Sequence, residues 1–339
     1  MAERVVLHIG PRKTATTYLQ RIMQQLVRDR LIPGRSYPLR TRGRMDHNHV
    51  PGLIDLARSV GDIRLQGDAW THQDGSDAQA LLRAVSESSH DVLLSAEAMS
   101  VLDAPTAHAL VAAFSPARVE VVITIRALDR AIPSSWQQHI RNGNHMLYAE
   151  YLESITHARD VTDDSEGFAF WRAYRYPDLV CRWREAAASV TVVTVPATSS
   201  DPALTWRRFR EAIALPDLPE EPPAITDERA NVSLTGAESF ALAALNEQAR
   251  ARGEDRRQVR AMHRQLLRDG WTERPDRGGR LGLPADMRER VQDWIDEDIA
   301  GLRGMSPHVI GDLEELRAHP GLDPGLPDDD DIARALAAT

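Results

Sequence analysis

The 339-residue sequence predicts an α/β fold in which a mostly parallel central sheet is flanked by helices and followed by a helical C-terminal part. Two observations lead to this fold class. Short apolar runs rich in β-branched residues alternate with longer segments whose apolar residues recur at helical spacing, a pattern typical of a parallel sheet covered on both faces. Towards the end of the chain only the helical pattern continues.

Strands are expected where short apolar runs occur. These runs are Arg4–Ile9, Asp91–Ser95, Val119–Ile125 and Val190–Val195. Strands that are buried on both faces of a sheet are nearly continuous in their apolar character, as these are.

Helices are expected between and after the strands, where apolar residues recur every three to four positions. Their ranges are Thr14–Arg30, Leu53–Val60, Gln79–Ser86, Pro105–Phe114, Asp129–Arg141, Asp178–Ala188 and Pro202–Ile213. Thr14 or Thr16 is expected to cap the first of them through its hydroxyl. After a proline-rich acidic linker at Leu215–Asp227, helices without a clear strand are expected at Ala237–Arg252, Asp255–Arg268 and Pro284–Leu302.

The same reading divides the chain into parts. Residues 1–215 are expected to form the α/β core, and residues 216–319 a helical part packed on it. Residues 320–339 form an acidic tail that includes Asp328–Asp331 and is expected to be solvated or partly disordered.

Composition limits the class of protein. The chain has 41 Lys+Arg against 50 Asp+Glu, a net charge of −9, which argues against a general nucleic-acid or anionic-membrane binder. No apolar run approaches the roughly 20 residues of a membrane span, and Met1–Gly10 lacks the apolar stretch of a signal peptide. A lone cysteine, Cys181, excludes an intrachain disulfide and a multi-cysteine zinc site. A cytoplasmic protein without a membrane span is expected.

One residue stands out in this composition. Lys13 is the only lysine, so 40 of the 41 basic residues are arginine. Lysine and arginine are not equivalent where a compact, flexible ammonium must reach a charged atom. A chain that uses arginine everywhere else therefore marks position 13 as a candidate functional site.

Lys13 lies between the first expected strand and the first expected helix. There the backbone N–H groups of the turn and the positive end of the helix dipole are expected to converge on one point. Lys13 adds a mobile charge, and the hydroxyls of Thr14, Thr16 and Thr17 add donors. Small Ala15 allows a ligand to approach the backbone, so the segment predicts an anion-binding loop.

An ATP- or GTP-binding loop is the weaker interpretation, because no glycine stands directly before the lysine and no later strand ends in the aspartate that would hold Mg²⁺. The segment resembles the 5′-phosphosulfate-binding loop of sulfotransferases that use 3′-phosphoadenosine 5′-phosphosulfate (PAPS), which typically runs Pro-Lys-Ser/Thr-Gly-Thr-Thr and then an aromatic residue. Ala15 replaces the usual glycine, which suggests an unstrained backbone there. The resemblance implies a P-loop-like sulfotransferase fold and a cofactor site formed by Arg12, Lys13, Thr14, Ala15, Thr16, Thr17 and Tyr18.

A second pair of residues fits the same family. Arg126 follows the third expected strand, and Ser134 lies eight positions later. In the family an Arg and a Ser at this spacing bind the 3′-phosphate that distinguishes PAPS from simpler nucleotides. Arg130, between them, is a further candidate, and a guanidinium can contact a phosphate through two N–H groups at once.

A later segment closes over the nucleotide in known relatives. Asn231 and Ser233 resemble the turn found there in some bacterial members and are candidate contacts, although they could equally form a helix cap. The segment Arg277-Gly278-Gly279 is the competing candidate.

Sulfuryl transfer needs a base on the acceptor and a positive charge near the leaving phosphate. Lys13 suits the second role, and no metal is expected. Glu97, which follows the second expected strand, is the first candidate for the base, and His49 is the second. His47, close to His49, is a weaker candidate as a base, and the two are not expected to bind a metal.

These features predict a sulfotransferase that moves the sulfuryl group of PAPS to a hydroxyl or amine and leaves adenosine 3′,5′-bisphosphate (PAP). The acceptor, a small molecule, glycan or lipid, is expected between residues 33–75 and residues 144–176. Aromatic residues clustered at Phe168–Trp183 are expected to be mainly helix core, with a pocket wall as the alternative. A nucleotide-dependent kinase and a catalytically silent nucleotide-binding protein are the alternatives, and a homodimer is possible in each case.

Overall fold

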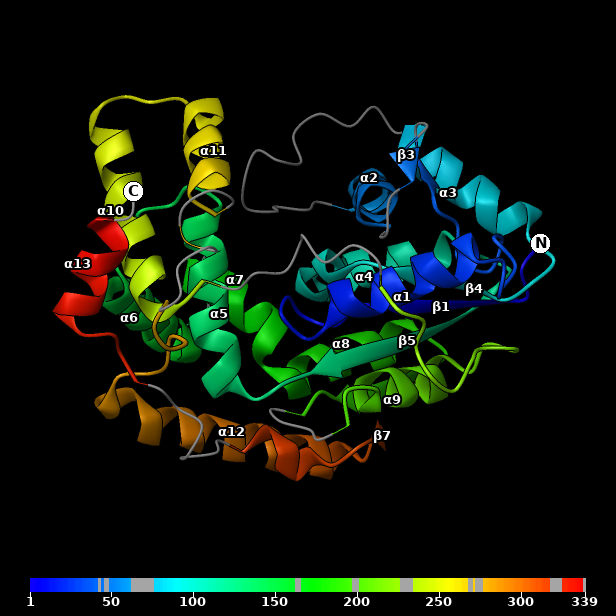
Figure 1. The fold of residues 1–339 in the computed structure, drawn as a ribbon. Coiled ribbons are helices and arrows are strands. Elements are labelled where there is room, and N and C mark those ends of the chain that lie inside the picture. Colours follow the sequence, from blue (N-terminus) through cyan, green and yellow to red (C-terminus); the bar gives the residue numbers. More distant parts are fainter. Residues whose placement is uncertain are drawn as a thin grey trace. The chain divides into compact units, whose positions relative to one another are not determined.

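The computed structural model describes residues 1–339 except 42–43, 46–48, 62–75, 162–165, 197–200, 226–233, 268–270, 272–276, 318–324 and 338–339. Figure 1 shows its helices and strands along the chain.

A five-stranded sheet with the order β4-β1-β5-β6-β7 forms the centre of the fold, and each neighbouring pair is parallel. The predicted α/β fold with a parallel sheet is confirmed. The strands are β1 (Arg4–His8), β4 (Val92–Ser95), β5 (Arg118–Ile125), β6 (Ser189–Thr194) and β7 (His308–Ile310). A separate two-stranded sheet pairs β2 (Arg40–Thr41) with β3 (Arg44–Met45).

Along the chain, helices alternate with the strands of the sheet and make up most of the C-terminal part (Figure 1). They are α1 (Thr16–Arg28), α2 (Val50–Val60), α3 (Ser76–Glu87), α4 (Ala104–Ala112), α5 (Leu128–Arg141), α6 (Tyr148–Asp160), α7 (Glu166–Tyr174), α8 (Tyr176–Ala186), α9 (Leu204–Ile213), α10 (Gly236–Ala251), α11 (Arg256–Gln265), α12 (Ala285–Met305) and α13 (Asp329–Ala337). Two short 3₁₀ turns, η2 (Glu97–Val101) and η5 (Leu313–Leu316), follow β4 and β7.

The apolar core explains why β1 and α1 are held rigidly against each other. Val6 of β1, Val122 of β5 and Val193 of β6 lie on one face of the sheet and are fully or almost fully buried. They pack in one cluster with Leu19 and Ile22 of α1, joined by Met23, Leu26, Trp206, Phe209 and Ile213. Burial of this many large side chains stabilises the strand-loop-helix unit on which the candidate site is built, at roughly 25 cal/mol per Å² of apolar surface.

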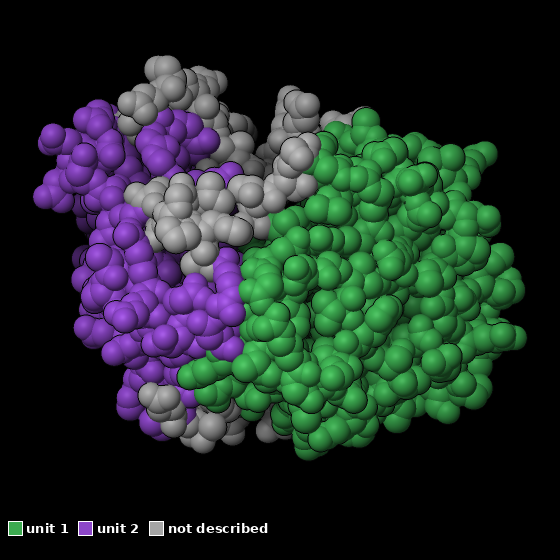
Figure 2. All heavy atoms as spheres, turned by 90° about the horizontal axis from the view of Figure 1, so that it is seen from below, with its two compact units in different colours: residues 1–126, 169–226, 297–316 green, residues 127–168, 227–296, 317–339 purple. Residues whose placement is uncertain are grey.

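The chain forms two compact units, which Figure 2 colours separately. The first comprises Met1–Arg126, Ala169–Thr226 and Glu297–Leu316, and the second Ala127–Phe168, Asp227–Asp296 and Arg317–Thr339. The sheet lies wholly in the first unit. These boundaries do not coincide with the expected boundary near residue 215, because each unit is assembled from three separate stretches of chain.

One expectation for the C-terminal part, the absence of a strand, was wrong, because β7 pairs with β6 through Val309 and Ile310. β7 is three residues long, and only Ile310 is fully buried, so it has no extended apolar run.

Residues 329–337 of the acidic tail form helix α13, in which only Ala335 is buried, so this part of the tail is helical and mostly solvated. The carboxylate of Asp328 accepts a hydrogen bond from the backbone N–H of Asp331, and acidic residues in the first turn stabilise a helix through its dipole. Ala335 is fully buried, and its carbonyl accepts a hydrogen bond from the indole N–H of Trp271.

Among the helices that the structure describes, none has the length and apolar character to cross a bilayer.

Candidate functional site

The loop that carries Lys13 occupies residues 9–15, between β1 and α1. β1 lies between β4 and β5 in the sheet, so the loop leaves the carboxyl edge of the sheet with a parallel strand on each side. Ligands of open parallel sheets bind at this edge. The strand, loop and helix occur where the sequence predicted them.

Three successive carbonyl groups of this loop are held by side chains of the first unit. The Thr14 hydroxyl donates to the carbonyl of Pro11 at 2.6 Å, and the Tyr174 hydroxyl donates to that of Arg12 at 2.6 Å. Nη1 of Arg126 donates to the carbonyl of Lys13 at 3.0 Å. In a trans peptide the N–H group points away from the carbonyl. The N–H groups of Arg12, Lys13 and Thr14 are therefore directed away from the side chains that hold the loop.

Two residues of the loop backbone are in the left-handed region, Lys13 with φ 67° and Ala15 with φ 63°. Left-handed residues alternating with right-handed ones form a nest, a concave set of N–H groups that binds anions, and positive φ at every second residue is the mark of such a turn. The expectation of an unstrained backbone at Ala15 was wrong, because a residue with a Cβ in this region costs roughly 1–2 kcal/mol.

Helix α1 begins at Thr16 and contributes further donors. Ala15 is its N-cap residue, and no described side chain caps the helix, so the expected cap by Thr14 or Thr16 was wrong. The first hydrogen bond of the helix runs from the N–H of Leu19 to the carbonyl of Ala15. The N–H groups of Thr16, Thr17 and Tyr18 precede this bond and have no partner within the helix.

The side chains of the loop divide into two groups. Arg12 and Thr17 are exposed and Lys13 is half-buried, so these three are accessible to a ligand. Thr14 and Thr16 are buried, and the Thr14 hydroxyl is directed into the protein. Thr14 can contact an anion only through its backbone.

Arg126 is half-buried at the residue after β5. Besides its bond to the Lys13 carbonyl, its backbone carbonyl accepts a hydrogen bond from the hydroxyl of Tyr176. Ser134 is half-buried on α5, in the second unit. The predicted pairing of Arg126 with Ser134 at one phosphate stays a prediction.

Glu97 is the first residue of η2, directly beyond the carboxyl end of β4. It is half-buried, and its Oε2 atom is inaccessible to water and lacks a hydrogen-bond partner among the described residues. Burial raises the pKa of the Tyr174 hydroxyl; the nearby guanidinium groups of Arg12 and Arg126 lower it and the Glu97 carboxylate raises it. The Tyr174 hydroxyl therefore interacts electrostatically with Glu97 as well as with Arg12 and Arg126. Because this hydroxyl also bonds the carbonyl of Arg12, the Glu97 carboxylate lies in the neighbourhood of the loop.

His49 lies in the core rather than in an accessible pocket, with 2% of its surface exposed. Nε2 is 2.6 Å from the carbonyl of Pro38, and Nδ1 accepts a hydrogen bond from the N–H of Ser95 at 3.0 Å. Burial lowers its pKa to about 4, and these two hydrogen bonds partly oppose the effect. Both ring nitrogens of His49 are thus occupied by groups of the chain itself, and the ring is not accessible to a bound acceptor in this arrangement. His47 lies outside the described residues.

The aromatic cluster is core, as the first interpretation had it. Phe170, Trp171, Tyr174, Tyr176 and Trp183 are each exposed by 6% or less. The side chain of Phe168 lies outside the described residues. Sequence reasoning missed that two of these, Tyr174 and Tyr176, hold the loop and Arg126 through their hydroxyls, because contacts over such sequence distances leave no local pattern.

Two residues below the loop were also missed, although both stand beside the motif. His8 is the last residue of β1 and fully buried between β4 and β5. A Cβ atom on Gly10 would lie 1.8 Å from the hydroxyl oxygen of Thr124. The order His-Ile-Gly at the end of β1 and the start of the loop was the available signal.

Three further candidate residues belong to the second unit. Asn231 and Ser233 lie outside the described residues. The guanidinium of Arg277 forms hydrogen bonds of 2.8 and 2.7 Å to both carboxylate oxygens of the fully buried Glu238. This pairing gives Arg277 a structural role in its own unit.

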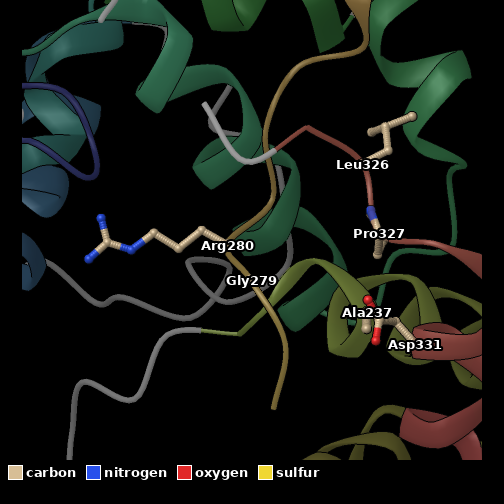
Figure 3. Close-up of a pocket in the computed structure, with 6 residues that line it drawn as sticks. All are labelled: Ala237, Gly279, Arg280, Leu326, Pro327 and Asp331. Atoms are coloured by element: carbon tan, nitrogen blue, oxygen red, sulfur yellow. The ribbon is translucent and has the colours of Figure 1, made fainter. Parts of the chain in front are cut away.

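A small pocket in the second unit is too small for a nucleotide. Its volume is about 80 Å³, well below the roughly 300 Å³ at which ligand pockets begin. Figure 3 shows the side chain of Arg280 extending away from the other lining residues, which are Ala237, Gly279, Leu326, Pro327 and Asp331.

Within the described residues, no group of three or more His, Cys, Asp or Glu side chains is arranged to hold a metal ion. No protein-family model, curated protein or solved structure matches the chain. The sheet topology shows an α/β fold with a parallel sheet. Because the comparisons add no family, any assignment of function depends on the loop and its surroundings.

Proposed function

We propose that the chain is a PAPS-dependent sulfotransferase. The observation that carries the proposal is the loop of residues 9–15, whose carbonyls at Pro11, Arg12 and Lys13 each accept a hydrogen bond from a side chain. The N–H groups of the same peptides point away from these bonds, and the loop leads into the first turn of α1 and contains the only lysine of the chain. Together they form a site for a doubly or multiply charged anion.

The residues present fit the 5′-phosphosulfate of PAPS. The backbone of Arg12–Tyr18, with the exposed side chains of Arg12 and Thr17, would bind its oxygens. PAPS would supply an activated sulfuryl group on a good leaving group. Lys13 would stabilise the negative charge that develops on the leaving phosphate, since a preorganised cation in a partly buried site is strongly stabilising.

The proton of the acceptor would pass to Glu97. Its Oε2 atom is buried and has no hydrogen-bond partner among the described residues, so this oxygen has a lone pair available for the proton of an acceptor. A general base of this kind typically contributes a factor of about 10² to 10⁴ in rate. The acceptor itself is a hydroxyl or amine whose identity the loop does not specify.

A nucleotide-dependent kinase is the second candidate, since the strand-loop-helix unit would also bind a triphosphate. Arg126, and not an aspartate, follows β5, and a cation at this place suits an additional phosphate rather than a magnesium ion. This observation favours the sulfotransferase. A silent nucleotide-binding protein would share the loop and differ only in lacking turnover.

The test is calorimetric titration of the full chain with PAP and with AMP, with Lys13→Ala as the control variant. PAP is expected to bind at least about tenfold more tightly than AMP, a difference of about 1.4 kcal/mol, and Lys13→Ala to weaken both. Transfer of labelled sulfuryl groups from PAPS to acceptors in a cell extract is expected to persist with EDTA. Equal affinity for PAP and AMP, or phosphoryl transfer from ATP that stops with EDTA, would overturn the proposal.

A further inference from the structure

A fully buried histidine lies directly beneath the anion-binding loop, at the centre of a connected set of polar side chains. His8 Nδ1 is 2.9 Å from the Ser95 hydroxyl of β4, and Nε2 is 3.1 Å from the Thr124 hydroxyl of β5. The set links three neighbouring strands to the loop and to α1. We call it the His8 network, and its members are Gln20, Ser95, His8, Thr124, Thr14 and the carbonyl of Pro11.

On the loop side, the direction of each hydrogen bond is fixed by counting protons. The Thr14 hydroxyl has one proton and donates it to the carbonyl of Pro11, which can only accept. The Thr124 hydroxyl, 2.8 Å away, must therefore donate its own proton to Thr14. Its oxygen is then left to accept from His8, so Nε2 of His8 carries a proton.

On the sheet side, the count closes without conflict. A neutral histidine protonated at Nε2 has an acceptor at Nδ1, to which the Ser95 hydroxyl donates. The Ser95 oxygen in turn accepts from the side-chain amide of Gln20 at 3.0 Å. Each of these protons is donated in one hydrogen bond of the network. Only the neutral Nε2–H tautomer of His8 is compatible with all of these hydrogen bonds.

The space for this network exists because residue 10 is glycine. A Cβ atom there would lie 1.8 Å from the Thr124 hydroxyl oxygen and 2.8 Å from that of Thr14. The two hydroxyls thus fill the place of a side chain at the point where the chain leaves β1. The turn of the loop is built around the hydroxyls rather than around an apolar side chain.

The surroundings of His8 support a neutral ring. Phe209 lies against it with a ring-centre distance of 4.8 Å, and burial lowers the pKa of His8 to about 3. A fully satisfied polar network in the protein interior stabilises one arrangement of its members.

We propose that His8, in its neutral Nε2–H tautomer, is a positioning residue that holds Thr124 and Thr14 so that the loop keeps its left-handed conformation at Lys13 and Ala15. It contacts no ligand and acts through the two threonines. The loop conformation belongs to the unliganded chain, so its tests do not depend on the proposed function; only the affinity measurement below rests on it.

The tautomer is tested by long-range ¹H–¹⁵N spectra of the histidine rings in the full chain, with His8 assigned by the loss of its signals in His8→Gln. A proton on Nε2, none on Nδ1 and no titration between about pH 5 and about pH 8 are expected. A proton on Nδ1, or titration near the ordinary pKa of histidine, would overturn the proposal.

The effect on the loop is tested with a label that the sequence makes selective. Because Lys13 is the only lysine, ¹⁵N-lysine labelling gives one backbone amide signal. The strong intraresidue contact between its amide and α protons, which a positive φ imposes, is expected in the wild type and in Thr124→Ser. Thr124→Val, which keeps the shape and removes the hydroxyl, is expected to weaken it and to move the signal.

Two controls separate this effect from general destabilisation. Thr191→Val, a matching change on β6 away from the loop, is expected to leave the Lys13 signal in place. PAP affinity is expected to fall about tenfold in Thr124→Val and to stay within about twofold in Thr124→Ser, as for a lost buried hydrogen bond. An unchanged Lys13 signal in folded Thr124→Val would contradict the proposed role of His8. A wild-type chain that does not bind PAP would contradict only the proposed function.

Discussion

Nη1 of Arg126 lies 3.0 Å from the carbonyl oxygen of Lys13, a bond that joins residues 113 positions apart. It ties the loop after β1 to the end of β5, and it turns the peptide that follows Lys13 so that its N–H points away from Arg126. The same side chain is the one expected to read the 3′-phosphate of PAPS. The contact with the loop is one role of Arg126, and the proposed contact with the 3′-phosphate would be a second, separable role in the choice of nucleotide.

Replacement of Arg126 separates these roles. Arg126→Ala is expected to lower the affinity for PAP more than the affinity for AMP. The contact with the loop affects the binding of both nucleotides, whereas the contact with the 3′-phosphate affects only the binding of PAP. A charged hydrogen bond of this type contributes about 1.5–3 kcal/mol, so the PAP-to-AMP affinity ratio is expected to fall roughly tenfold or more. Titration calorimetry on both nucleotides measures the ratio. If both affinities fall by one factor, Arg126 acts on the loop alone.

Glu97→Gln tests the proposed base. The amide keeps the shape of the carboxyl group but cannot act as a base towards the hydroxyl or amine that receives the sulfuryl group. Turnover is therefore expected to fall by a factor of about 10² to 10⁴. PAP affinity is expected to stay within about twofold, since the phosphosulfate is bound by the loop. The same kinetic measurements on His49→Gln provide the comparison. A glutamine side chain there can accept a hydrogen bond from the backbone N–H of Ser95 and donate one to the carbonyl of Pro38. Greater loss of turnover in that variant would reverse the assignment.

The sheet and the loop were predictable from sequence because their signals are local. Apolar runs marked β1, β4, β5 and β6, and the only lysine marked the loop. β7 was missed since a three-residue strand at the sheet's edge has no apolar run. Helix α13 was missed because its acidic first turn has the composition of a solvated tail.

The environment of each side chain was less predictable than its position. His49 precedes α2 as a polar residue in an irregular segment, which suggested an accessible ring. Its burial depends on contacts with Pro38 and Ser95, and the second of these lies 46 residues away. Arg126 and Tyr174 reach the loop over 113 and 162 residues. Local periodicity gives no information on such pairs, so the side-chain support of the loop required the structure.

The strain at Ala15 leads to a prediction on stability. Ala15→Gly is expected to raise the free energy of unfolding by about 1 kcal/mol or somewhat less, because glycine adopts a positive φ without a Cβ penalty but loses more entropy on folding. Ala214, with φ 44° at the C-terminus of α9, is a matched control away from the loop. Urea unfolding should show a similar gain in both variants, whereas PAP affinity should change only in Ala15→Gly. A loss of stability in Ala15→Gly would contradict the left-handed conformation there.

Buried neutral histidines make stability depend on pH. Burial lowers the pKa of His49 to about 4 and that of His8 to about 3, against 6.5 for an exposed ring. Above the ordinary value both rings are neutral in the folded and unfolded chains, and stability is independent of them. As the pH falls below that value, the unfolded chain binds protons that the folded chain does not. Stability is then lost until the folded pKa is reached.

The expected loss is about 1 kcal/mol per pH unit for each ring, so urea unfolding should give a lower free energy at about pH 5 than at about pH 7. His49→Gln removes its own titration and leaves those of His8 and of His263, whose pKa burial also lowers, so the slope of stability against pH is expected to fall by up to about 1 kcal/mol per pH unit. The slope, and not the absolute free energy, is the measurement that decides, because the loss of the buried ring lowers stability at both pH values. An unchanged slope would mean that His49 accepts a proton in the folded chain near its ordinary pKa, and that its ring is reachable by water after all.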